Sequence, residues 1–113
     1  MKEFMLIFIG EDRTQRQLSP EQMQTQMGKW MSWVDSLKAK GTYVEGRPLI
    51  PAAKTVKGKK PVVTDGPFAE SKEIVGGYFI VKASSLEEAA AIAKDCPDFE
   101  LGSAVEVREV MKM

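Results

Sequence analysis

Phe4-Met5-Leu6-Ile7-Phe8-Ile9 is the stretch that decides the fold. Alternate residues of a strand point to opposite faces of a sheet, so this run presents apolar side chains on both faces. It is too short for a membrane span or for the core of a signal peptide. The run therefore predicts a central strand, and Ile74 to Lys82, which is also apolar on both faces, predicts another.

Two helices are predicted outside these strands. Ser19-Pro20-Glu21-Gln22 has the form of an N-terminal capping box, and the helix that it starts runs to about Lys40. Ser85 with Glu88 starts a shorter helix, which Pro97 stops. On the first helix the apolar residues recur three and four apart, and we expect Met23, Met27 and Met31 to fill the core together with Trp30.

Three further strands are predicted. Residues 42–44, 61–64 and 103–111 show the two-residue period of strands. Residues 48–61 hold three prolines and several lysines, which suits a hairpin tip or a mobile loop. The resulting order is the βαββαβ pattern of a ferredoxin-like sandwich with an added hairpin, an α+β fold in a single domain over residues 1–113.

One face of this sheet needs a cover that the chain does not supply. Two helices cover a single face, yet both central strands are apolar on both faces. The most economical cover is another copy of the chain. The sequence therefore predicts a homodimer that forms through the sheet.

The composition excludes several classes of function. Sixteen Lys and Arg residues balance sixteen Asp and Glu residues, so we expect neither nucleic acid nor an anionic membrane as a partner. The absence of histidine removes Ser-His-Asp and Cys-His catalysis and His-ligated zinc, and we expect no metal and no cofactor. The single cysteine, Cys96, excludes an intramolecular disulfide and fits a reducing cytoplasm.

A longer motif identifies a family. Residues 64–73, Thr-Asp-Gly-Pro-Phe-Ala-Glu-Ser-Lys-Glu, with Gly76-Gly77-Tyr78 after them, resemble the DGPF-type branch of the YCII-related domain family. Residues 85–89 and 105–108 resemble that family's second helix and closing strand. The resemblance implies a dimeric α/β-barrel of two ferredoxin-like halves, small-molecule clefts and a bacterial cytoplasmic setting.

The same resemblance implies little about the function of this chain. Some YCII-like proteins are credited with a His-Asp pair, which this chain cannot supply because it has no histidine. A relative is described as a dehydrochlorinase of a chlorinated aromatic. Other DGPF-type relatives are associated with alternative sigma factors, which implies an accessory or regulatory role.

Two carboxylates, Asp65 and Glu106, are the candidates for acid–base catalysis. Asp65 begins a turn, where it either accepts a backbone hydrogen bond or acts as a general base at the mouth of a cleft. Glu106 shares a strand face with Arg108. These two charges either form a structural ion pair, or Arg108 grips an anionic ligand while Glu106 orients it or exchanges a proton.

Four further residues are candidates for ligand binding: Tyr78, Gly76, Gly77 and Trp33. The Tyr78 hydroxyl donates either to a ligand or to the backbone. The two glycines leave room inside a strand for a ligand, a bulge or an overlying aromatic ring. Trp33 lies beside the apolar stripe of its helix, where it either rims a cleft or covers the edge of the core.

We therefore expect a homodimer that binds a small anionic molecule and that, if it is an enzyme, uses carboxylate chemistry. The alternative is a non-catalytic accessory module that acts with a protein partner such as an alternative sigma factor. Asp65, Tyr78, Glu106 and Arg108 around one pocket would favour the first function. A shallow surface whose charges are all paired within the chain would favour the second.

Overall fold

The structure, a computed structural model, describes residues 1–11, 17–66 and 73–113. Its elements are β1 (Lys2–Gly10), α1 (Pro20–Ala39), β2 (Tyr43–Pro48), β3 (Ala53–Lys57), β4 (Val62–Gly66), β5 (Ile74–Ala83), α2 (Leu86–Ala93), the 3₁₀ turn η2 (Pro97–Leu101) and β6 (Ala104–Glu109). Residues 67–72 of the motif that carries the family resemblance lie outside the described residues, and so does the end of the turn expected at residues 65–67.

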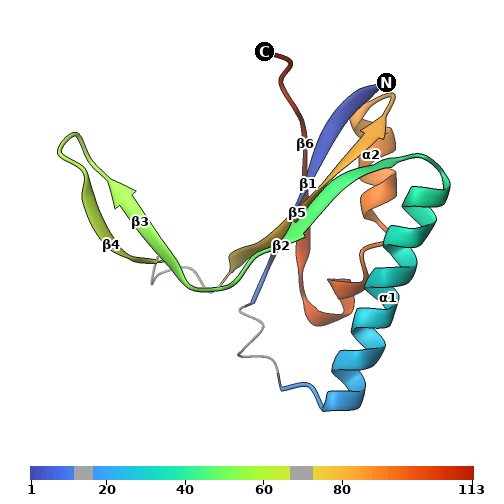
Figure 1. Cartoon of the computed structure of the whole chain (residues 1–113), viewed down its shortest axis with the longest axis horizontal. Helices are drawn as coiled ribbons and strands as arrows, with labels where there is room; N and C mark the ends of the chain where they lie inside the picture. The colour runs from blue at the N-terminus through green and yellow to red at the C-terminus, as the bar shows by residue number, and fades with distance from the viewer. Residues whose placement is uncertain (12–16, 67–72) are drawn as a thin grey trace.

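Four strands form one antiparallel sheet in the order β2-β5-β1-β6, an arrangement compatible with a ferredoxin-like sandwich. The strands predicted to be central, β1 and β5, are the inner pair. α1 and α2 cover one face of the sheet and leave the other face open (Figure 1). The predicted α+β fold is confirmed to this extent. Over its described residues, the single chain forms an open sheet and no closed barrel.

The first helix begins where the sequence predicts. The Ser19 hydroxyl accepts from the Gln22 N–H at 3.1 Å, and Gln22 Oε1 accepts from the Ser19 N–H at 2.8 Å. Gly41 follows the helix with a φ of 71°, a left-handed conformation that glycine adopts readily. The chain can therefore reverse into β2 directly after α1.

The core lies between the helices and the covered face of the sheet. Its buried members are Phe4, Leu6, Trp33, Leu37, Phe79, Val81, Ala83, Ala89, Ala93 and Cys96. The expectation that Met23, Met27 and Met31 fill the core is wrong, because their exposed fractions are 52%, 68% and 61%. The two indoles of α1 occupy the space above the sheet, and this orientation of the helix leaves the methionine row at its outer flank.

A hairpin stands apart from this sandwich. β3 and β4 form a separate two-stranded sheet with Val56 opposite Val63 and Lys54 opposite Asp65. β3 lies inside the stretch expected to be a hairpin tip or mobile loop, so that stretch is more regular than expected. The hairpin projects from the end of β2, on the side of the sheet opposite α1 and α2 (Figure 1). We call residues 49–66 the arm.

Candidate functional site

Aromatic rings from four elements meet between α1 and the sheet, and we call them the aromatic cluster: Phe8, Trp30, Trp33, Tyr43 and Phe79. The two tryptophans are three residues apart on α1, so both point from one side of the helix toward the strands. The Phe8 ring centroid is 4.9 Å from that of Trp30 and 4.8 Å from that of Phe79, with edge-to-face geometry. The cluster thus joins helix and sheet through ring contacts.

The two indole nitrogens of the cluster differ in hydrogen bonding. Trp30 Nε1 donates to Asp98 Oδ1 at 2.9 Å. Trp33 is only 6% exposed, and its Nε1 is buried without a hydrogen-bond acceptor among the described residues. Leaving a buried donor without an acceptor costs about 1–3 kcal/mol. Trp33 Nε1 is therefore a buried donor to which residues 1–11, 17–66 and 73–113 offer no polar partner.

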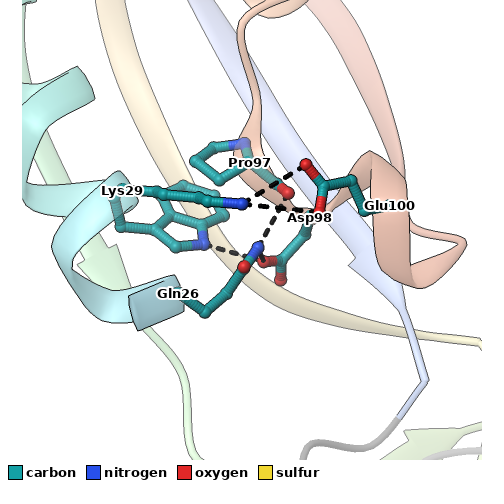
Figure 2. Close-up of polar contacts among 6 residues, drawn as sticks. Gln26, Lys29, Pro97, Asp98 and Glu100 are labelled. Carbon is teal, nitrogen blue, oxygen red and sulfur yellow. Dashed lines mark hydrogen bonds and ion pairs between the residues drawn. The ribbon is translucent and has the colours of Figure 1, made fainter. Parts of the chain in front are cut away.

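Asp98 also fastens η2 to α1 (Figure 2). Gln26 Nε2 donates to Asp98 Oδ1 at 2.9 Å and to the Pro97 carbonyl oxygen at 2.7 Å. Lys29 Nζ pairs with Glu100 at 3.3 Å on the exposed side of the same contact. These bonds fix the position of α1 over the sheet, and with it the position of the aromatic cluster.

A groove of about 790 Å³ lies beside this contact, between α1 and the connection from α2 to β6. Lys29, Ser32, Lys94 and Phe99 are among the residues that line it. Its described lining includes none of the candidate site residues. The groove is therefore separate from the predicted site.

The two glycines of β5 shape the backbone beneath the cluster. Gly77 lies opposite Phe8, and the strand register then shifts past Gly76, which is the extra residue of a β-bulge. A Cβ atom on Gly77 would lie 2.8 Å from the carbonyl oxygen of Arg47 on β2. A bulge and a close strand approach thus account for these two glycines. Gly77 shares its sheet face with Phe8.

Tyr43 closes the cluster at the β2 edge, with its ring centroid 5.4 Å from that of Phe79. Burial raises the pKa of its hydroxyl above the usual 10.0, and the Arg47 charge opposes this shift. Tyr43 is therefore neutral at physiological pH. Its role in the cluster is that of a packed ring.

The other candidates lie on the uncovered side of the sheet, which we call the open face. One row across it reads Arg108, Met5, Ile80 and Glu45, and the next reads Glu106, Ile7, Tyr78 and Arg47. Apolar side chains and Tyr78 occupy the centre, and charged side chains stand at both edges. The charges alternate in sign along each edge strand and across each row.

These edge charges find few partners within the described part of the chain. The Tyr78 hydroxyl donates to Glu45 Oε1 at 3.4 Å rather than to the backbone. In the part of the chain that the structure describes, Glu106 and Arg108 form no ion pair with each other. Sequence reasoning missed Glu45 and Arg47, although the two-residue period of β2 places both on one face.

Asp65 lies far from the sheet candidates in the fold. It is on β4 of the arm, where its carboxylate pairs with Lys54. The two carboxylates predicted for catalysis, Asp65 and Glu106, therefore belong to separate parts of the molecule. The candidates fall into three places: Trp33 and the β5 glycines at the aromatic cluster, Tyr78, Glu106 and Arg108 on the open face, and Asp65 on the arm.

Two further searches of the described residues gave negative results. Over residues 1–11, 17–66 and 73–113, no three Asp, Glu or Cys side chains gather as metal ligands would. None of the helices in these ranges is long and apolar enough to cross a membrane.

The amino-acid sequence was compared with protein families and with curated proteins. A family model described as the YCII-related domain matches residues 4–113. The uncharacterized protein R00369 of Rhizobium meliloti (strain 1021) is 36% identical over 63 residues, which are 47% of this chain and 51% of that protein. The match thus spans about half the length of this curated relative.

A solved structure shares the fold. It is 5-chloro-2-hydroxyhydroquinone dehydrochlorinase (TftG) from Burkholderia phenoliruptrix AC1100, in complex with 2,5-dihydroxybenzoquinone. The superposition has a TM-score of 0.50 with 19% sequence identity, and it covers 98% of this chain and 95% of that chain.

Proposed function

This chain belongs to the YCII-related domain family, and we propose that it is a homodimeric protein that binds a small, planar, anionic molecule at the aromatic cluster. The observation that carries the proposal is Trp33 Nε1, a buried donor to which the described residues offer no acceptor. A ligand oxygen would satisfy this group. Phe8 and Trp30 are only partly buried, so the cluster has an accessible side.

The chemistry of the cluster selects the class of ligand. Aromatic side chains favour a flat ring that packs against their faces and edges. An indole N–H only donates, so the ligand must present an acceptor oxygen, and a negatively charged oxygen forms the stronger bond. TftG, which has the same fold, is solved with a small ring compound that carries oxygens, 2,5-dihydroxybenzoquinone.

The open face supports the homodimer. Met5, Ile7, Ile80 and Tyr78 form a central strip in which the described chain leaves Met5, Ile7 and Tyr78 partly exposed, whereas Ile80 is only 7% exposed. A second copy, related by a two-fold axis that runs along the strands, would set the β2 edge of each copy over the β6 edge of the other. We call this arrangement the aligned dimer.

The edge charges are complementary in the aligned dimer. Glu45 of one copy meets Arg108 of the other, and Arg47 meets Glu106, because each pair occupies the same row of the sheet. The two-fold axis repeats each contact. If the sheets crossed at right angles, the same positions would bring like charges together.

This assignment separates the binding site from the dimer contact. The sheet lies between Trp33 and the open face, so one ligand cannot touch both Trp33 and Arg108. Neither Asp65 nor Glu106, the two carboxylates predicted for catalysis, lies at the cluster, and the proposal is therefore one of binding. The accessory-module alternative calls for charges paired within the chain, and the lack of a Glu106–Arg108 pair among the described residues supports the binding function.

The ligand site can be tested with 2,5-dihydroxybenzoquinone and simple aromatic hydroxy acids as probes. Both tryptophans of the chain belong to the cluster, so a bound probe quenches their fluorescence. Trp33→Phe keeps a ring but removes the donor. We expect the probe Kd to rise about tenfold or more, the loss of one hydrogen bond to a charged acceptor.

Trp30→Phe is the matched control. It removes the bond from Trp30 to Asp98 and lowers the free energy of unfolding, but it retains the Trp33 donor and thus most of the probe affinity. If no probe in the series binds, or if Trp33→Phe binds the probe with the wild-type Kd, the proposed ligand site is wrong.

A further inference from the structure

The arm projects from the body of the molecule, by which we mean the four-stranded sheet with its two helices. β3 and β4 pair with each other as a sheet of their own, and their side chains are largely exposed. A lone two-stranded hairpin is marginally stable in water. The Cα radius of gyration is 15.7 Å, against about 13 Å expected for a compact chain of this length, so the arm stands clear of the body.

Apolar side chains concentrate on the arm. Its exposed large aliphatic residues are Leu49, Ile50, Val56, Val62 and Val63. Val56 and Val63 are cross-strand neighbours, and each is 60% exposed. Single exposed apolar residues are ordinary, but several on one projecting element indicate a contact surface.

We propose that the arm clasps a second copy of this chain, namely the copy that covers the open face, and the inference therefore rests on the dimer proposed above. The arm leaves the β2 edge and projects on the side of the sheet opposite the helices (Figure 1). A copy packed on the open face lies on that same side. In the aligned dimer the arm of each copy runs past the β6 edge of the other.

The size of the open face argues that the dimer needs such an arm. A four-stranded sheet is about 19 Å wide, and six residues of strand are about 20 Å long, which gives a footprint of about 400 Å² per copy. Protruding side chains increase the area of this surface by about half, so the two copies together would bury about 1,200 Å². This area is the lower limit of stable specific interfaces. Contacts of two arms raise the area above that limit.

The charges of the arm favour the same arrangement. The turn of the arm carries Lys59 and Lys60, and Lys57 precedes them at the end of β3. Two such lysine-rich tips repel each other. A dimer that sets β2 over β6 places the two arms at opposite edges, whereas one that sets β2 over β2 would bring them together.

The test compares dimer dissociation constants by sedimentation equilibrium. Val56→Thr with Val63→Thr preserves side-chain shape and strand propensity but adds hydroxyl groups. We expect the dimer Kd to rise about tenfold or more, while the circular dichroism of the body stays unchanged. Met27→Gln is the matched control, because Met27 is 68% exposed but lies on α1, outside the proposed contact, and this variant should keep the wild-type Kd.

Amide hydrogen exchange of residues 53–66 gives an independent readout in the wild-type protein. These amides should be protected above the dimer Kd and exchange fast below it, because a free hairpin is marginal. Exchange that does not depend on association, or a wild-type Kd for the valine variant, overturns the arm contact and leaves the sheet dimer standing. A wild-type chain that stays monomeric overturns both.

Discussion

Exchanging the two charges of β6, by Glu106→Arg together with Arg108→Glu, separates a contact between copies from an ion pair within the chain. A pair within the chain would survive the exchange, because both signs remain on the same strand face. In the aligned dimer the exchange sets like charges against Glu45 and Arg47 of the second copy. We therefore expect the variant to fold and to dissociate.

The magnitude follows from the geometry. Packed sheets lie about 10 Å apart, a gap that arginine and glutamate side chains reach across from opposite sides. All four residues are exposed at the edges of the sheet, so each contact attracts by only about 0.5 kcal/mol, and its reversal repels by a similar amount. The two-fold axis makes four contacts, which gives a swing of about 4 kcal/mol and a Kd about a thousandfold higher.

Sedimentation equilibrium at low and high salt measures this effect. The Debye length falls to about 3 Å at 1 M salt, so the difference between variant and wild type should shrink there. Urea unfolding of the variant serves as the control for an intact fold. A Kd within about twofold of the wild-type value at low salt would refute the reasoning, because four repulsive contacts predict a change of about three decades.

Three further predictions concern the aromatic cluster. Asp98→Ala should lower the free energy of unfolding by about 2 kcal/mol in a urea melt, because it removes the acceptor of the Trp30 Nε1 hydrogen bond. An unchanged urea midpoint would contradict this. Gly46→Ala should destabilise by about 1–3 kcal/mol, since its Cβ would lie 2.4 Å from the Phe79 ring, whereas Gly28→Ala meets nothing within 4 Å and should stabilise α1. The raised pKa of Tyr43 favours its neutral form in the folded state, so this contribution to stability is complete well below pH 10 and is lost as the pH rises through the raised pKa; Tyr43→Phe should reduce the fall in stability above about pH 10.

Much of the fold could be predicted because its signals are local. An apolar run on both faces identified β1 as a central strand, and the capping box at Ser19 identified the start of α1. The methionines of α1 were wrongly predicted to lie in the core. Met27 and Trp30 belong to adjacent stripes of one helix, and spacing alone does not tell which stripe faces the sheet.

The candidate site was predicted less well because it depends on register and packing. Strand alternation correctly placed Glu106 and Arg108 on one face. Glu45 and Arg47 were missed because the strand was expected only over residues 42–44, whereas β2 continues to Pro48, and alternation could not show that β2 is the opposite edge strand. Trp33 Nε1 becomes a buried donor without an acceptor among the described residues only when α1 packs on the strands, so no sequence pattern marks it.

Sedimentation of an equimolar mixture of two charge-exchanged chains tests the proposed dimer most directly. One chain carries Glu106→Arg with Arg108→Glu, and the other carries Glu45→Arg with Arg47→Glu, so each chain alone sets like charges against its own copy. In the mixed pair every contact joins opposite charges again. We predict that each chain alone sediments as a monomer and that the mixture sediments as a dimer with the wild-type Kd. A mixture that stays monomeric, or a chain that dimerises alone as the wild type does, would contradict the β2-over-β6 dimer.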